Sequence, residues 1–253
     1  MELFKELKQV FKKKIYEMNE NELDEFIKEQ LPTKKLEKDK YGEVFTNPIL
    51  INKMLDLFPK EKIILPLPDA VFEFYPNFFS AEQADVLFEK LLNETPWQHD
   101  EITIFGKKIL QPRFTCLFGN EGKPYSYSGI TMQPHRWNTT LMHVKNEIEK
   151  VSEHHFTTVL ANLYRDEKDS NGWHADNERE LGRDPIIASV SFGEERKFQL
   201  KHTTQQNIKL NLNLNHGSLL LMKEGSQIHY KHQIPKETQP KKQRINLTFR
   251  TIL

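Results

Sequence analysis

The C-terminal part of the chain is a succession of short segments with the composition of β-strands, separated by turn residues. Two of them alternate between apolar and polar side chains, IKLNLNL at 208–214 and RINLTFR at 244–250, which is the period of a strand with one buried face. The seven candidate strands are 156–164, 186–192, 197–202, 208–214, 218–222, 228–233 and 244–250. So many short strands joined by turns predict a β-sandwich or a jelly-roll barrel.

Helical patterns flank and precede these strands. Apolar residues recur at helical spacing in 1–31 and again in 138–151, where Asn138 is the expected N-cap. Ser80, with Gln83 three residues later, predicts the start of a third helix over 81–93. A shorter helix is expected at 49–57. The predicted fold class is therefore α+β, dominated by β-structure.

The domain organisation follows from where these patterns change. Pro32 ends the first helical pattern, and the Lys-rich, polar segment 33–43 is typical of a linker. We therefore divide the chain into a helical N-terminal extension with its linker, 1–65, and a β-rich domain, 66–253.

The composition excludes several classes of protein. Hydrophobic residues make up 37% of the chain and charged residues 28%, as in ordinary globular proteins. No stretch approaches the roughly 18 apolar residues of a membrane helix, and the first residues, MELFKELKQVFKKK, lack the apolar core of a secretory signal. Cys116 is the only cysteine, so an intrachain disulfide and a cysteine-based zinc site are excluded. We expect a monomer without a membrane partner, in the cytoplasm or, in a eukaryote, the nucleus.

The net charge is zero, with 36 basic and 36 acidic residues, which argues against a uniformly basic nucleic-acid binder. Two segments, 104–145 and 231–253, are nevertheless locally basic. They are either solvated faces or surfaces for an anionic partner.

A candidate metal site combines two histidines and a carboxylate. In His174-Ala175-Asp176 two ligand-type side chains stand two residues apart, so on a strand or at its mouth they point to the same face. His232 lies in another predicted strand. Two histidines and one carboxylate leave three positions open on a metal, which suits non-haem Fe(II). Zinc is less well supported because the chain has no HExxH pair. The alternative for His232 is an ordinary strand histidine.

Two arginines follow the second histidine and suggest an anion site. In the run 244–250 the polar residues Arg244, Asn246, Thr248 and Arg250 alternate with apolar ones. If this face looks into the barrel, the buried cations need an anion, and a dicarboxylate such as 2-oxoglutarate fits arginine. The alternative is a solvated outer strand face.

Asn162 and Tyr164 share a face of the strand that precedes His174, and both can donate to carboxylate oxygens. They are the remaining candidates for binding an anion. Their alternative is a polar sheet surface.

Several motifs together resemble the AlkB-like 2-oxoglutarate/iron(II) dioxygenases of the nucleic-acid repair branch. The resemblance covers roughly residues 70–253 and is carried by NLYRD (162–166), WHADNEREL (173–181), IASVSFG (187–193), HGSLLLM (216–222), HQIP (232–235), RINLTFR (244–250), FGK (105–107), PR (112–113) and YSYSG (125–129). It implies a double-stranded β-helix with Fe(II) held by His174, Asp176 and His232.

The resemblance also implies how the co-substrate is bound. Arg244 binds the distal carboxylate of 2-oxoglutarate with help from Tyr164 and Asn246. Arg250 and Asn162 attend the carboxylate nearer the metal. The implied reaction uses O2 to hydroxylate an N-methyl group on a base such as 1-methyladenine or 3-methylcytosine. The expected role is DNA repair, with RNA, a protein or a small molecule as the alternative substrate.

A base must leave its stack to reach buried iron, and the resemblance assigns residues to hold it. Tyr127 and the imidazole of His174 match stacking positions, Tyr125 is a neighbouring aromatic, and Glu178 reads the base edge. Phe105 matches a wedge that enters the gap left by the flipped base, although core packing explains it equally well.

Three further positions concern the substrate. Arg113, within the PR match, completes the substrate-binding set. Asn177 replaces an acidic residue common in the family, and Ala175 stands where relatives carry a larger or basic residue. These two departures concern substrate preference and remove no metal ligand. The implied partner is nucleic acid, DNA more than RNA.

Overall fold

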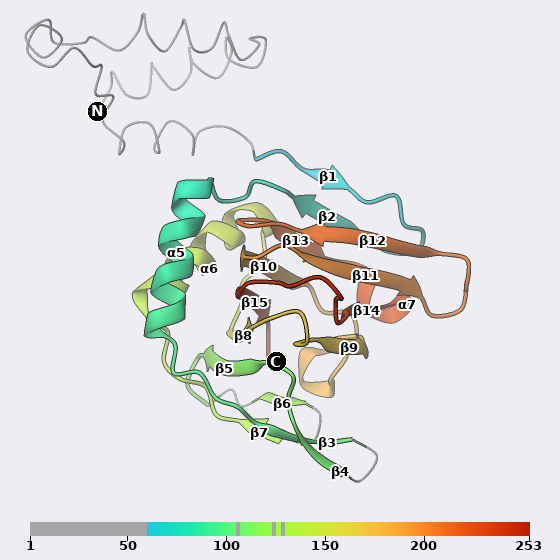
Figure 1. Ribbon diagram of the computed structural model, residues 1–253. Helices are drawn as coiled ribbons and strands as arrows, with labels where there is room; N and C mark the ends of the chain where they lie inside the picture. Colours follow the sequence, from blue (N-terminus) through green and yellow to red (C-terminus); the bar gives the residue numbers. More distant parts are fainter. Residues whose placement is uncertain (1–59, 105–106, 123–124, 128–129) are drawn as a thin grey trace, which may run out of the picture. The chain divides into compact units, whose positions relative to one another are not determined.

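The structure is a computed structural model, and the residues it describes are 60–104, 107–122, 125–127 and 130–253 (Figure 1). They belong to one unit, Lys60–Leu253. The helices predicted at 1–31 and 49–57 lie outside the described residues, and the boundary between 65 and 66 stays a prediction. None of the helices in the described ranges is long and apolar enough to cross a membrane.

The largest of four antiparallel sheets in the described residues forms the centre of the fold. Its seven strands lie in the order β1-β2-β13-β10-β15-β8-β5. Their bounds are β1 Ile63–Ile64, β2 Phe72–Tyr75, β5 Phe114–Gly119, β8 Thr158–Tyr164, β10 Ile187–Gly193, β13 Leu219–Met222 and β15 Arg244–Arg250. Every residue of β8 and β15 is buried, which shows that both faces of the sheet are covered.

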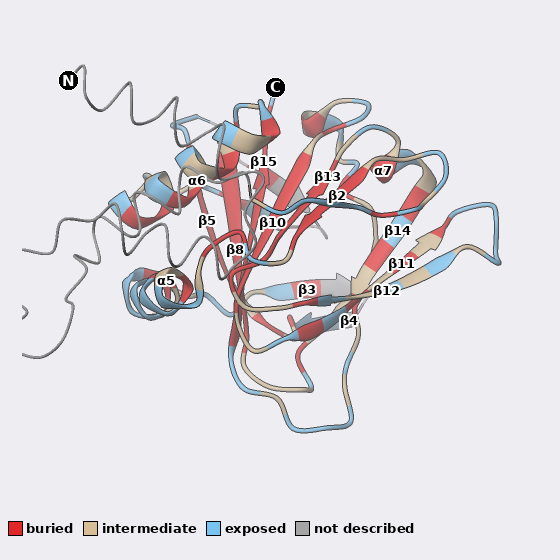
Figure 2. Ribbon diagram, turned by 90° about the horizontal axis from the view of Figure 1, so that it is seen from above, coloured by how far each residue is buried: buried red, intermediate tan, exposed pale blue. Residues whose placement is uncertain are grey.

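Two helices cover one face of this sheet, α5 (Ala81–Glu94) and α6 (Thr139–Ser152), and Figure 2 shows them on the same side of it. The predicted caps are confirmed, because Ser80 accepts from the backbone of Gln83 and Asn138 from that of Leu141. Apolar residues of both helices pack on the odd-numbered residues of β15. This core includes Leu87, Leu91, Leu141, Val144, Ile148, Ile245, Leu247 and Phe249.

The smaller sheet packs on the opposite face of the large one. Its strands lie in the order β12-β11-β14-β9, with bounds β9 Asn171–His174, β11 Arg196–His202, β12 Lys209–Leu214 and β14 Tyr230–Ile234. A second core lies between the sheets and joins Phe72, Phe74 and Ile187 to Phe198, Leu200 and Tyr230.

Shorter elements complete the described fold. Two hairpins pair β3 (Glu101–Ile104) with β4 (Lys107–Leu110) and β6 (Tyr125–Tyr127) with β7 (Ile130–Met132). A 3-10 turn, η1, spans Arg179–Leu181.

The seven predicted strands match to within two residues, but one of them has a wrong start, and several strands of the structure, among them β2, were not in the predicted set. The start of the predicted strand 228–233 is wrong, because α7 (Ser226–His229) takes up its first residues and β14 begins at Tyr230. Strand β9 was not among the predicted seven. It is four residues long and contains Gly172, which gives it no alternating pattern.

Candidate metal centre and co-substrate pocket

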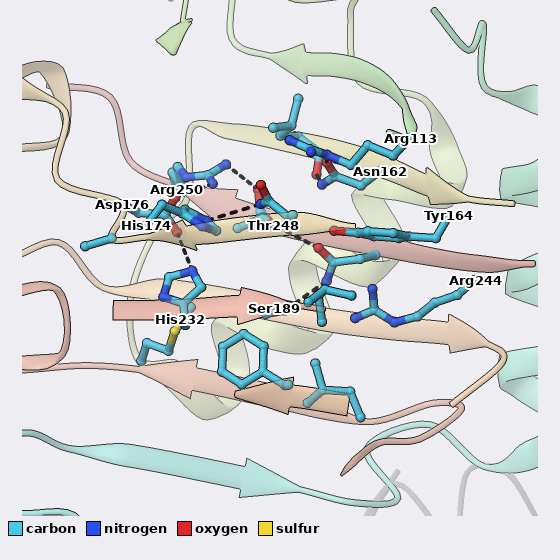
Figure 3. A pocket seen from close by; sticks show the side chains of 18 of the residues that line it. Arg113, Asn162, Tyr164, His174, Asp176, Ser189, His232, Arg244, Thr248 and Arg250 are labelled. Atoms are coloured by element: carbon cyan, nitrogen blue, oxygen red, sulfur yellow. Dashed lines mark hydrogen bonds and ion pairs between the residues drawn. The ribbon is translucent and has the colours of Figure 1, made fainter. Parts of the chain in front are cut away.

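A cavity of about 130 Å³ lies between the two sheets, and strands of both line it (Figure 3). The predicted site residues that line it are Arg113, Tyr125, Asn162, Tyr164, His174, Asp176, Glu178, His232, Arg244, Asn246 and Arg250. Phe105 lies outside the described residues, and Tyr127 is described only as part of β6. Residues far apart in sequence are thus brought to one place.

The two candidate histidines face each other across neighbouring strands of the small sheet. His174 on β9 is the register partner of His232 on β14, and their ring centroids are 4.2 Å apart. Asp176 follows two residues after β9 ends, with its Oδ2 3.9 Å from His232 Nε2. One potential ligand atom from each of the three lies within 4.8 Å of the others. They can therefore reach one metal ion.

Both imidazoles are set to act as ligands. His174 Nδ1 lies 2.7 Å from the Gly172 carbonyl, which can only accept, so Nδ1 carries the proton and Nε2 offers a lone pair. Burial lowers the pKa of His174 and lowers that of His232 to about 3. Neutral rings are the form that binds metals.

Asp176 is buried and held from two sides. Its Oδ1 accepts a hydrogen bond of 2.7 Å from Arg250 Nη2, and its backbone N–H donates to Gln227 Oε1 at 2.8 Å. Burial alone would raise the pKa of Asp176, but the charge of Arg250 beside it helps to lower that pKa. The residue is therefore a carboxylate. Two imidazoles and one carboxylate, leaving positions open, are the donor set of non-haem Fe(II) sites.

The polar face of β15 points into the cavity. Arg244, Asn246, Thr248 and Arg250 are all buried and line it, so the solvated outer face considered for this strand is wrong. Asn246 Nδ2 donates to Ser189 Oγ at 2.8 Å and to the Val190 carbonyl at 3.0 Å, and Thr248 Oγ1 donates to Asn246 Oδ1 at 2.9 Å.

Arg244 is a buried cation with unpaired hydrogen-bond donors. Its Nη2 donates to Ser191 Oγ at 3.0 Å, but Nε and Nη1 are buried and find no hydrogen-bond partner in the described structure. The Tyr164 ring lies 5.1 Å away, and burial lowers the pKa of Arg244 to about 10. Two unpaired N–H groups on a buried guanidinium form a fork for a carboxylate.

Asn162 and Arg113 are bonded to each other. Arg113 Nε donates to Asn162 Oδ1 at 2.8 Å, and its Nη1 donates to the Ser170 carbonyl at 3.3 Å. Arg113 is itself buried. It thereby orients the Asn162 amide at the cavity wall.

Tyr125 and Glu178 line the cavity beside the metal-binding residues. The Arg250 guanidinium lies 5.0 Å from the centre of the Tyr125 ring. Glu178 Oε2 is buried and has no hydrogen-bond partner in the part of the chain that is described. Burial and the charge of Asp176 raise the pKa of Glu178.

Three supporting residues were not predicted. Ser189 and Ser191 bond Asn246 and Arg244, and their alternation with apolar residues in IASVSF marks a polar strand face that could have been found. Gln227 holds Asp176 from α7, and no sequence pattern points to it.

Comparison with known proteins assigns the family. The sequence profile of the 2OG-Fe(II) oxygenase superfamily matches residues 72–250. Alpha-ketoglutarate-dependent dioxygenase alkB homolog 3 from Bos taurus is 41% identical over 193 residues, 70% of this chain and 64% of that protein. DNA oxidative demethylase ALKBH2 from Homo sapiens is 34% identical over 189 residues, 71% of this chain and 72% of that protein.

The solved structure of OsALKBH1 has the same fold, with a TM-score of 0.54 and 15% identity, and covers 76% of this chain and 100% of its own. The chain thus spans less than two thirds of the bovine relative but more than two thirds of the human one. The expected jelly-roll fold and the resemblance to AlkB-like dioxygenases are both confirmed. The chain belongs to the 2OG-Fe(II) oxygenase superfamily, among the alkB homologues.

Proposed function

We propose that the protein is an Fe(II)- and 2-oxoglutarate-dependent dioxygenase that removes methyl groups from N-methylated bases in nucleic acid, with DNA as the expected substrate. The observation that carries the proposal is the pairing of two half-sites in one cavity. Three metal-ligand atoms lie within 4.8 Å of one another, and a buried arginine with unpaired N–H groups lines the same space.

His174, Asp176 and His232 would hold the iron. The Gly172 carbonyl fixes the tautomer of His174, and Arg250 and Gln227 fix the carboxylate of Asp176. Such supporting contacts orient metal ligands. When bound, iron supplies the oxidative chemistry, in which O2 converts 2-oxoglutarate to succinate and CO2 and hydroxylates the N-methyl group, which then leaves as formaldehyde.

Arg244 would bind the distal carboxylate of 2-oxoglutarate, because two of its donors, Nε and Nη1, are buried in the cavity wall without a partner among the described residues. Ser191 holds the third guanidinium nitrogen, and Tyr164 and Asn246 lie on the same wall. Arg250 and Asn162 would attend the carboxylate nearer the metal. Arg250 already bonds Asp176 and keeps a buried, unpaired Nε for this purpose.

On the substrate side, Tyr125 and Glu178 would contact a flipped base. The unpaired Oε2 of Glu178 supports a role in reading a base edge, and Arg113 completes this wall through Asn162. Tyr127 and Phe105 are proposed, from the family resemblance, to stack on the base and to fill its gap. The names of the relatives, an alpha-ketoglutarate-dependent dioxygenase and a DNA oxidative demethylase, describe those proteins and support the same reaction class here.

The test is a demethylation panel of methylated DNA and RNA, each as single strand and duplex, with formaldehyde as the readout. We expect release that depends on both Fe(II) and 2-oxoglutarate and is greatest on DNA. The variants His174→Ala and Asp176→Ala should lose turnover and Fe(II) binding together. Absence of turnover on every nucleic acid would overturn the substrate class, and retained iron binding in both variants would overturn the ligand assignment.

A further inference from the structure

The outer face of the small sheet, turned away from the cavity, is cationic. Along β11 the residues Phe198 and Leu200 point into the core between the sheets, so Lys197, Gln199 and Lys201 point outward. The residues that make up this outer face are Lys197, Gln199, Lys201, Lys209, Asn211, Asn213, Lys231, Gln233 and Trp173. None of them is Asp or Glu. Figure 1 labels β12 and β9, which are the two edge strands of this sheet.

Three of the lysines stand side by side. Lys201 on β11 is the direct register partner of Lys209 on β12 and of Lys231 on β14. No ion pair links any of the three to an acidic group among the described residues. Like charges directly opposite each other destabilise a sheet. A row of lysines that destabilises the sheet in this way indicates a negatively charged ligand that neutralises it.

The neighbouring row is neutral and fixed by its own hydrogen bonds. Gln199 Nε2 donates to Asn211 Oδ1 at 2.9 Å, and Gln233 Nε2 donates to Gln199 Oε1 at 2.6 Å. These amides bond each other and leave the lysines as the charged groups of the face.

An exposed tryptophan lies beside the lysine row. Trp173 is 38% exposed, and Lys201 Nζ lies 4.2 Å from the centre of its ring. It directly precedes His174 on the edge strand β9. Because successive residues of a strand point to opposite faces, Trp173 marks the outer face at the point where His174 enters the cavity.

We propose that this outer face, the lysine row with Trp173, binds the phosphate backbone of single-stranded nucleic acid and leads the strand over β9 toward the cavity. The inference rests on the proposed function. Adjacent strands are about 4.8 Å apart, so the three lysines span about 10 Å, which is enough to contact more than one phosphate of a strand. Lysines that follow a backbone, next to an aromatic ring on which a base stacks, are how proteins bind single strands.

The test compares two triple variants of the full chain that lose the same charge. The first is Lys201→Gln with Lys209→Gln and Lys231→Gln. The control is Lys90→Gln with Lys168→Gln and Lys242→Gln, which are exposed lysines off this sheet. Binding of a fluorescein-labelled single strand longer than about 16 nucleotides, carrying one 3-methylcytosine, is measured by anisotropy over a range of salt concentrations.

We expect the first variant to bind about tenfold or more weakly at low salt, and the slope of log affinity against log salt to fall by about 2, since each phosphate contact on a single strand contributes about 0.7. The control should keep the wild-type slope. Removing the like-charge row should not lower the melting temperature, which checks that the variant is folded. Binding should also quench tryptophan fluorescence in the wild type, and Trp173→Leu should remove most of that quenching.

The outcomes separate this inference from the proposed function. Turnover of a methylated trinucleotide by the wild type tests the function alone. If that turnover is present but the first variant keeps the wild-type affinity and salt slope, the surface assignment is wrong. Equal or stronger dependence of duplex binding on the three lysines would overturn the assignment to single strands.

Discussion

Arg196 and Arg244 are both buried, with 0% and 1% of the residue exposed, but their hydrogen-bond partners differ. The four hydrogen bonds of Arg196 go to the Glu237 carboxylate at 2.9 Å and to the carbonyls of Asp166, Asp169 and Pro235 at 2.8 to 3.0 Å. Arg244 donates to Ser191 through Nη2 and interacts with Tyr164, but its Nε and Nη1 are buried and have no hydrogen-bond partner among the described residues. The first arginine serves the fold, and the second is arranged for a ligand.

Replacing each arginine by methionine should separate these roles. Arg196→Met should lower the free energy of unfolding by about 3 to 5 kcal/mol, because it leaves a partly buried carboxylate and three carbonyls without their donor. Arg244→Met should leave it unchanged or raise it by about 1 kcal/mol, because an incompletely paired buried charge is removed. Urea unfolding without ligands measures both. Equal losses of stability in the two variants would contradict the assignment of Arg244 to a ligand.

Cys116 should be inert in the folded protein. It is fully buried on β5, and burial raises the pKa of its thiol to about 12. At pH 8 about one thiol in ten thousand would then be ionised, and the thiolate is the reactive form. Iodoacetamide at pH 8 should therefore label the native protein far more slowly than the protein in guanidinium, as measured by intact mass. Comparable labelling rates would mean that β5 opens readily.

The sequence pointed to the ionic residues of the candidate site more readily than to their partners. His174, Asp176, His232 and Arg244 were singled out because histidine, carboxylate and arginine are chemically distinctive, and all four line the cavity. The bond between Arg113 and Asn162, and that between Arg250 and Asp176, depend on strand positions that only the folded chain supplies. Side-chain partners are set by three-dimensional register, which local patterns do not contain.

At the scale of elements, strand β15 shows what a periodic pattern determines. Its odd residues join the core under the helices and its even residues line the cavity, as the alternation predicts. The pattern alone left open whether the polar face met solvent or a ligand. The small sheet decided this, because it packs over the large sheet on that side and closes the cavity that the even residues line.

Helix α6 offers a test of an element that supports the sheet without reaching the cavity. Asn138 Oδ1 accepts from the Leu141 backbone at 2.8 Å and caps the helix. Asn138→Ala should lower the free energy of unfolding by about 1 kcal/mol, whereas Asn138→Asp, which keeps an acceptor, should change it little. Thermal unfolding followed by circular dichroism measures both. If aspartate fails to preserve stability, the cap is not what Asn138 contributes.

At the scale of the whole molecule, the cavity is shared between two sheets. Arg244 comes from the large sheet, and His174 and His232 come from the small one. A ligand that reaches from the arginine to the metal would join the sheets directly. The number of strands predicted a sandwich. Whether Arg244 lies close to the two histidines, however, depends on the order of the strands within each sheet, and short strands with similar patterns do not specify that order.

This arrangement predicts that metal and co-substrate stabilise the fold together. At a concentration 100 times its dissociation constant, a ligand adds about 2.7 kcal/mol to the free energy of unfolding, which corresponds to about 5 to 11 °C in melting temperature for a protein of this size.

We expect Mn(II), a redox-inactive stand-in for iron in this test, to raise the melting temperature, and 2-oxoglutarate to raise it further. The shift from 2-oxoglutarate should be larger with Mn(II) present than without it, because a ligand that reaches from Arg244 to the metal binds more tightly when the metal is there, and by linkage it strengthens metal binding equally. Arg244→Met should lose the 2-oxoglutarate shift and keep that of Mn(II), while His174→Ala should lose the Mn(II) shift. An undiminished 2-oxoglutarate shift in Arg244→Met would place the dicarboxylate outside this cavity, and additive shifts in the wild type would mean that no single ligand bridges the two sheets.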